Sequence, residues 1–255
     1  YADRYSLDAV RWFLTTQGPL GANDADFAHA RFIEVYNADL ANSVGNSMSR
    51  VGNMIGKYFD GEITRTCNGE FGFEGGKALQ LALKALENAG KGADDPSRTF
   101  DFAKFTSQAV DDAIDALARL DLEAMLDHGR SIVRYVDDFI SYCAPFTLAK
   151  QLDTLEHADK ALATILYSCA EGLRIASLLL YPAMPDKMAG LWRDWGCTHL
   201  RDPGDMNSGF VGPLRELAAW TGEHSIRVGQ TMSKGEALFM RADASEPAPV
   251  AETAS

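Results

Sequence analysis

The sequence predicts an all-α protein, built as an antiparallel bundle of about five long helices with a short leading helix. Apolar residues recur at steps of three or four in several long segments, which is the spacing of a buried helix stripe. Strand-like alternation persists nowhere, and no segment of roughly 20 to 50 residues repeats. Apolar residues make up 46% of the 255 residues, enough for a sizeable core.

Capping residues and helix breakers bound the predicted helices in order along the chain. Ser6 can cap the leading helix, Asp24 or Asp26 can cap the long second one, and Pro145 breaks a later one. The predicted helices cover residues 6–16, 27–59, 77–88, 101–117, 121–142 and 158–180. A short closing helix is predicted within 184–196, and residues 212–220 are predicted to form a short segment packed across the bundle. The Gly-rich stretch 68–76 is predicted to be a turn or irregular loop.

Charge and cysteine content limit the classes of function. The net charge of −12 argues against broad, non-specific nucleic-acid binding, because phosphate contacts need positive charge. It still permits a small basic patch that reads a few unpaired bases. The four cysteines form no C-x-x-C pair, and a buried reduced thiol is expected at Cys143 and Cys169, which fits a reducing cytoplasm. No apolar run long enough to cross a bilayer and no signal peptide are predicted.

The stretch from Asn37 to Gly61 has two distinct helix faces. One is apolar at helical spacing. The other is a polar row, with spacings of four, four and three, made of Asn42, Asn46, Arg50 and Asn53. Asn is a poor helix former, so this composition is unusual for a merely solvated face. Amides and a guanidinium in line could read the edges of unstacked bases. A solvated face or a polar contact between helices is the alternative.

The polar row lies within one of five segments that together match a known family. They are NADLANSVGNSMSR with KYFDG (37–61), SLDAVRWFL (6–14), APFTLAK (144–150), LRIASLLLYPAMP (173–185) and ALFMRAD (237–243). In this order they resemble the anticodon-binding domain of bacterial methionyl-tRNA synthetases. The resemblance runs from about Tyr1 to Asp243 and is weakest over 62–121.

The resemblance implies a class I aminoacyl-tRNA synthetase anticodon-binding domain whose partner is tRNA(Met). In that family the residues matching Asn42, Asn46 and Arg50 face the anticodon loop. Those matching Asn46 and Arg50 are associated with the wobble cytosine of the CAU anticodon. Arginine donors suit O2 and N3 of cytosine, whereas uracil presents a donor at N3. Phosphate contacts are expected from Arg31, Lys57 and Lys150.

Two positions depart from the family pattern. Phe146 stands where the family has the stacking Trp of A-P-W. Phenylalanine can stack on a base but lacks the indole N–H, and a core position is the alternative for it. Asp137 stands where the family usually has Asn, and an acid near an RNA-facing surface would repel phosphate.

The sequence offers no convincing catalytic or metal site. The histidines are scattered and are expected to be surface or structural residues: His29, His128, His157, His199 and His224. The tripeptide MSK at 232–234 is interpreted as coincidental. The resemblance therefore implies that this chain is inactive alone and carries no cofactor. ATP, and any zinc ion, would belong to a catalytic domain that joins methionine to tRNA and that this chain lacks.

The expected organisation is a junction to the catalytic domain over 1–23, the bundle over 24–243 and a disordered tail over 244–255. The catalytic domain is itself an expected partner, whereas membranes and DNA are not. Two alternatives stay open. One is the anticodon domain of another class I synthetase, for valine, leucine or cysteine. The other is a helical protein-interaction scaffold, favoured by the negative charge and by Trp192 and Trp195.

Overall fold

The structure is a computed structural model that describes residues 1–18, 27–67, 84, 99–197, 200 and 212–249. Within these residues it is mostly helical. The β-structure found there is limited to isolated bridge residues, among them the antiparallel pair Glu62 and Thr231. The predicted all-α fold is thus confirmed for the described part of the chain. The predicted helix 77–88, except Lys84, and the Gly-rich stretch 68–76 lie outside it.

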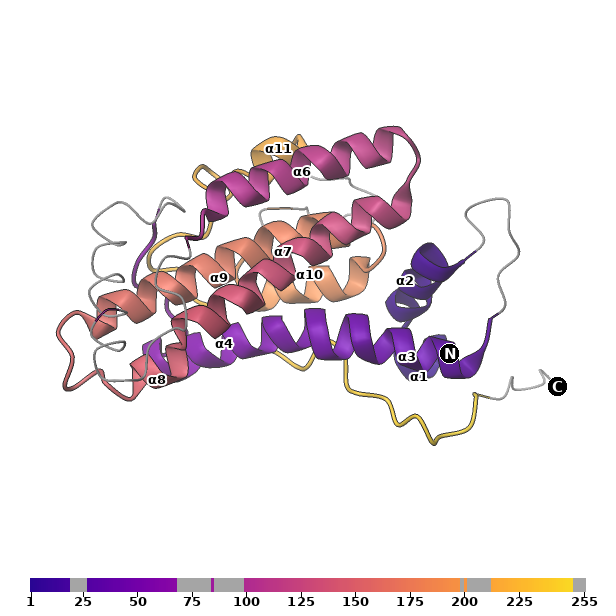
Figure 1. The fold of residues 1–255 in the computed structure, drawn as a ribbon, viewed down its shortest axis with the longest axis horizontal. Helices are drawn as coiled ribbons and strands as arrows, with labels where there is room; N and C mark the ends of the chain where they lie inside the picture. The colour runs from indigo at the N-terminus through magenta and orange to yellow at the C-terminus, as the bar shows by residue number, and fades with distance from the viewer. Residues whose placement is uncertain (19–26, 68–83, 85–98, 198–199, 201–211, 250–255) are drawn as a thin grey trace.

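The described helices form a bundle whose long members run side by side (Figure 1). α7 and α9 pack against each other at its centre, α6 covers both, and the long helix that contains α4 packs on the other side. In chain order the helices are α1 (Ala2–Tyr5), α2 (Leu7–Gln17), α3 (His29–Val35), η1 (Tyr36–Gly45), α4 (Asn46–Phe59), α6 (Phe102–Ala118), α7 (Leu122–Cys143), α8 (Pro145–Ala149), α9 (Ala158–Leu180), α10 (Pro185–Asp194) and α11 (Leu214–Leu217).

Side-chain caps set the start of three helices, close to where the sequence predicts them. The hydroxyl of Ser6 accepts a hydrogen bond from the Ala9 amide at the start of α2. The carboxylates of Asp101 and Asp121 accept amide hydrogen bonds in the first turns of α6 and α7. These caps satisfy amides that a helix cannot pair internally.

The long helix differs from the predicted single α-helix over 27–59. Its middle, η1, is a π-helix, with α3 before it and α4 after it. The residues proposed to cap its start, Asp24 and Asp26, lie outside the described part. A π-helix closes its hydrogen bonds over five residues instead of four, and such segments often mark functional sites. The periodicity did not reveal this change, because residues four apart lie on nearly the same side in a π-helix as well as in an α-helix.

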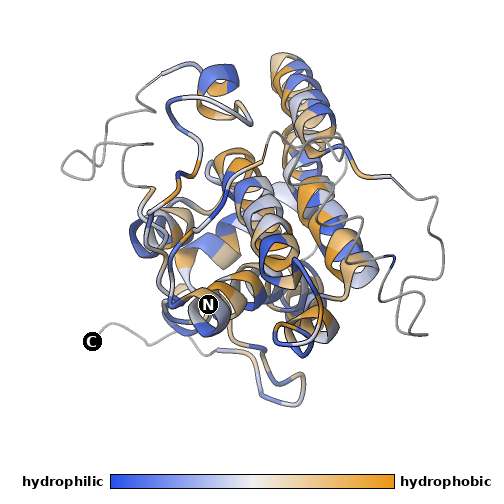
Figure 2. Ribbon diagram, turned by 90° about the vertical axis from the view of Figure 1, so that its left-hand side faces the viewer, coloured by the Kyte–Doolittle hydropathy of each residue, from blue (hydrophilic) through white to orange (hydrophobic). Residues whose placement is uncertain are grey.

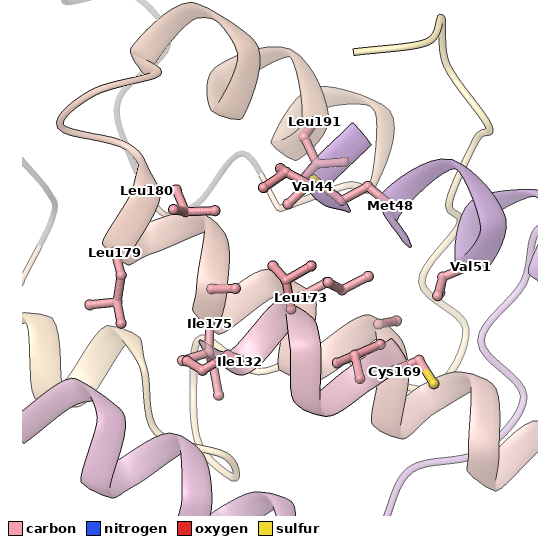
Figure 3. Packing of buried hydrophobic residues seen from close by; sticks show 14 of the residues in the cluster. Val44, Met48, Val51, Ile132, Cys169, Leu173, Ile175, Leu179, Leu180 and Leu191 are labelled. Atoms are coloured by element: carbon pink, nitrogen blue, oxygen red, sulfur yellow. The ribbon is translucent and has the colours of Figure 1, made fainter. Parts of the chain in front are cut away.

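The core is centred on α9, which is buried on nearly all sides. Figure 3 shows Leu173, Ile175, Leu179 and Leu180 of this helix beside apolar residues of the neighbouring helices. By length and composition α9 could cross a membrane, contrary to the sequence-based expectation, but its apolar window is entirely buried inside the protein. That burial is the behaviour of a core helix. Hydrophilic and hydrophobic residues occupy different sides of the surrounding helices (Figure 2).

The chain returns along the long helix as a C-terminal strap, residues 226–246. The Met232 amide bonds the Gly61 carbonyl (2.7 Å), and Phe239 lies against Gly45. Farther on, the Ala242 amide and carbonyl both bond the Asn37 side chain (2.8 and 3.0 Å). The strap therefore runs antiparallel to the helix. Its last residue, Glu246, falls in the expected tail but pairs with Arg4. Residues 250–255 lie outside the described part.

Candidate nucleic-acid interface

The polar row lies on the outer side of the long helix. Asn42 in η1 and Asn46 and Asn53 in α4 are exposed, and Arg50 is partly exposed. The opposite side is buried in the core at positions such as Val44, Met48, Val51 and Ile55. Within the described part of the chain, no hydrogen bond from another helix reaches these three exposed amides, so a helix–helix contact is not what this part shows for Asn42.

Arg50 is held in place by a neighbouring helix. Its Nη1 donates to Oδ1 of Asp137 on α7 (3.3 Å), and each of the two side chains is 31% exposed. The hydroxyl of Ser47, which is buried, donates to the other oxygen of Asp137 (2.7 Å). The carboxylate is therefore fixed from both sides. This fixes the guanidinium in turn, while both groups keep a surface open to solvent.

The electrostatics of Asp137 reflect its half-buried position. Burial raises the pKa of this carboxyl, while the Ser47 hydrogen bond and the Arg50 charge lower it and the neighbouring Asp138 raises it. By its sequence position alone, Asp137 is expected to repel phosphate. The structure instead places it in an ion pair, which offsets part of its charge.

Phe146 lies on a short corner helix at the same end of the bundle as α4 (Figure 1). α7 ends in the left-handed residue Ala144, and Pro145 then occupies the first turn of α8. Leu148 anchors α8 in the core, whereas the Phe146 ring is 47% exposed. The alternative of a core position for Phe146 is therefore wrong. An exposed ring on an anchored turn can stack on a base.

The three basic residues expected to contact phosphate are all exposed, but they are not equally placed. Lys57 lies in the last turn of α4 and its ammonium lies over the Tyr58 ring. Lys150 follows α8 directly. Arg31 lies about five helical turns before Arg50, where it bonds Gln17 and pairs with Glu34. Lys57 thus lies one turn beyond Asn53 at the end of the polar row, Lys150 follows the corner helix, and Arg31 lies near the opposite end of the long helix.

Two residues of the NADLAN motif have structural contacts that the sequence reasoning missed. Asn37 bonds the C-terminal strap, as described above. Asp39 accepts hydrogen bonds from the Trp12 indole and from Arg130 of α7, both at 3.2 Å. The motif therefore contains Asn37 and Asp39, which fix the helix against the rest of the protein, and Asn42, which is exposed to solvent. The sequence carried one sign of these contacts: Asn37 and Asp39 are polar but do not fall at the spacing of the exposed polar row.

The remaining sequence candidates are structural where they are described. Arg174 is buried and pairs with Glu171 within the bundle. Cys143 and Cys169 are buried thiols. Met232 of the MSK tripeptide is buried in the strap, which fits the interpretation of coincidence. Among the described residues no group of three or more His, Cys, Asp or Glu could hold a metal ion; His199 lies outside them.

The two tryptophans that favoured an interaction scaffold are both buried. Trp192 donates to the Ser177 hydroxyl (2.7 Å) and stacks on Tyr181, and Trp195 is enclosed in the core. Neither ring is available to a partner, so the two tryptophans do not support a role as an interaction scaffold.

Sequence comparisons give a consistent set of relatives. The family model described as tRNA synthetases class I (M) matches residues 1–52. The methionine–tRNA ligase of Caldanaerobacter subterraneus subsp. tengcongensis is 29% identical over 241 residues, and that of Streptomyces coelicolor is 30% identical over 239. These alignments cover 94% and 93% of this chain. The chain spans only 31% and 37% of the relatives' own lengths.

Structural comparison shows that the fold is shared. The free form of Mycobacterium tuberculosis methionyl-tRNA synthetase aligns with a TM-score of 0.66 at 21% identity, over 95% of this chain and 40% of that one. The form bound to methionyl-adenylate aligns with a TM-score of 0.67 at 20% identity, over 94% and 39%. The helical bundle therefore corresponds to a part of these larger proteins.

Proposed function

We propose that this chain is the anticodon-binding part of a methionine–tRNA ligase and that it reads the CAU anticodon of tRNA(Met). The whole enzyme would attach methionine to this tRNA with ATP. The described residues of this chain would contribute recognition rather than chemistry. The homology to methionine–tRNA ligases along nearly the whole chain supports the enzyme class, and the exposed polar row supports the anticodon role.

The observation that carries the proposal is the fixed, partly exposed Arg50 within a row of exposed amides. A guanidinium held by Asp137, whose carboxylate is fixed in turn by Ser47, loses little conformational freedom on binding. Its remaining donors can meet N3 and O2 of a cytosine, while Asn46 can donate to or accept from either edge. Uracil would place its N3 donor against a donor, and an unpaired polar contact is costly once desolvated.

Phe146 would supply the sequence-independent part of the binding. An exposed aromatic ring on an anchored turn can stack on an unpaired base, worth about 1–3 kcal/mol by substitution. Lys57 and Lys150 would contact the adjoining phosphates. Correct docking of the anticodon would then place the tRNA so that its distant acceptor end reaches the active site, which converts binding energy at one end into rate at the other.

The proposal is tested by the binding of the chain to two anticodon stem-loops, CAU and UAU, at low and moderate salt. We expect CAU to bind more tightly by about 1–3 kcal/mol, with both affinities falling as salt rises. Arg50→Ala should abolish the preference. Arg134→Ala is the matched control, because Arg134 is an exposed arginine that pairs with Asp127 on α7. Equal binding of both stem-loops by the unaltered chain would overturn the proposal.

A further inference from the structure

The carboxylate that holds Arg50 is itself partly exposed. Asp137 uses Oδ1 to accept from Arg50 and Oδ2 to accept from Ser47. An ionised carboxylate has about four lone-pair sites, so two of them remain for another donor. With 31% of its side chain exposed, Asp137 can offer one of these sites to a ligand that Arg50 contacts.

Arginine alone cannot satisfy the whole edge of a cytosine. That edge carries one donor, the N4 amino group, beside two acceptors, N3 and O2. A guanidinium has donors only, and so it leaves the amino group without a protein acceptor. A carboxylate is a suitable acceptor for the cytosine amino group. An Asp beside an Arg presents an acceptor next to donors, which is the pattern that guanine offers to cytosine.

We propose that Asp137 is a second specificity-determining residue, which accepts a hydrogen bond from the N4 amino group of the wobble cytosine while Arg50 donates to N3 and O2. This inference rests on the proposed function. Uracil is refused twice in this arrangement, because its O4 acceptor would face the Asp137 carboxylate and its N3 donor would face Arg50. The Ser47 hydrogen bond keeps the carboxylate oriented when the base is absent.

The arrangement also accounts for an acid at this position. A carboxylate on an RNA-facing surface costs affinity through repulsion of phosphates. Here its charge is opposed by Arg50 and its position is fixed by Ser47. The cost is therefore reduced, and a hydrogen bond to a specific base group is gained. Asn46 is the rival acceptor for N4, because its exposed amide can turn its oxygen outward.

The test removes each partner of the proposed hydrogen bond separately and together. The stem-loops carry CAU, UAU, or CAU in which the first base is 2-pyrimidinone, a cytosine without the N4 amino group. The chains are the unaltered protein, Asp137→Ala and Asp127→Ala. Asp127 is the matched control, because it is also an α7 carboxylate paired with arginine. Removal of the amino group should weaken binding by the unaltered chain and by Asp127→Ala about tenfold.

Asp137→Ala should bind CAU about tenfold more weakly, with no further loss when the amino group is removed. Asp137→Asn, which keeps one acceptor oxygen and preserves the side-chain shape, should regain part of the discrimination and serves if Asp137→Ala fails to fold. If removal of the amino group weakens binding by Asp137→Ala as much as by the unaltered chain, the inference is wrong. Asp137 would then only position Arg50. If removal of the amino group weakens binding by Asp137→Ala but not by Asn46→Ala, the hydrogen bond from N4 belongs to Asn46 and the inference is wrong.

The two proposals fail in distinguishable ways. If the unaltered chain does not prefer CAU to UAU, the anticodon role itself is wrong. If that preference holds but the amino group and Asp137 act independently, the anticodon role stands and the role of Asp137 is wrong.

Discussion

Asp8 shows how one buried carboxylate can join two distant parts of this chain. It lies in α2, is almost completely buried, and accepts a hydrogen bond from the Lys187 amide at the start of α10 (2.7 Å). Arg11 donates to its other oxygen at 3.0 Å. Asp8 therefore acts as a cap supplied from outside the helix, since α10 has no side-chain cap of its own.

The ionisation of Asp8 gives a pH-dependent contribution to stability. Burial raises the pKa of Asp8, with Asp186 adding to the rise and the Lys187 and Arg11 contacts opposing it. The folded protein then holds this proton more tightly than the unfolded chain, whose Asp pKa is about 3.9. The contribution is complete below that value and is lost as pH rises to the folded-state pKa.

We expect the free energy of unfolding of the unaltered chain, relative to Asp8→Asn, to fall as pH rises above about 4 and then to level off. Denaturant unfolding at a series of pH values measures this difference. Asp3→Asn, which removes an exposed carboxylate from the same region, is the control for net charge. A difference that grows with pH would show that the pKa of Asp8 is lowered on folding instead.

At the scale of elements, close contact between α7 and α9 depends on a glycine. A Cβ atom at Gly129 would lie 2.9 Å from Leu180 Cδ2 and 3.1 Å from Leu179 Cβ. Both leucines are buried in the core (Figure 3). Glycine lowers helix propensity by about 1 kcal/mol relative to alanine, so its presence within α7 is explained by this packing.

Gly129→Ala should destabilise the protein by about 1–3 kcal/mol, because overpacking outweighs the gain in helix propensity. Denaturant unfolding gives the change. Gly56→Ala is the matched control, since Gly56 is exposed within α4 and an added Cβ would meet nothing within 4 Å. That control should be stabilised by up to about 1 kcal/mol. A stabilised Gly129→Ala variant would contradict the tight contact between α7 and α9.

At the scale of the whole molecule, a buried ion pair joins α9 to the C-terminal part of the chain. Arg174 and Glu171 are both fully buried, with Nη2 and Oε1 at 2.6 Å. Arg174 also donates to the Leu217 carbonyl (2.6 Å), and Glu171 accepts from the Ile226 amide (2.9 Å). These bonds fix the segment that leads into the C-terminal strap. The strap then lies along the helix that carries the polar row.

Arg174→Met should lower the free energy of unfolding by about 3–5 kcal/mol, because it leaves the Glu171 carboxylate buried without its partner. Arg215→Met is the matched control, as it removes an exposed ion pair with Asp111, and should cost no more than about 1 kcal/mol. Denaturant unfolding compares the two. Similar small losses in both variants would mean that the buried pair does not hold the C-terminal segment.

The helical class, most helix boundaries and the exposed polar row could all be predicted from the sequence. These features are local: helical periodicity, caps such as Ser6 and Asp121, and breakers such as Pro145 act within a few residues. α9 spans Ala158–Leu180, as predicted, because its apolar run is bounded on both sides. The exposure of Asn42, Asn46 and Asn53 follows from the same periodicity.

Which distant residues meet depends on how the helices pack in three dimensions. Arg50 pairs with Asp137 only because α4 packs against α7 where these two residues lie. They are 87 residues apart in the sequence, so no local pattern reveals the pair. The same holds for Asp8 with Lys187, for Asn37 with the strap, and for the burial of Trp192 and Trp195. Such contacts depend on how complete helices pack. An acid that looked repulsive in the sequence therefore became the residue that orients the arginine.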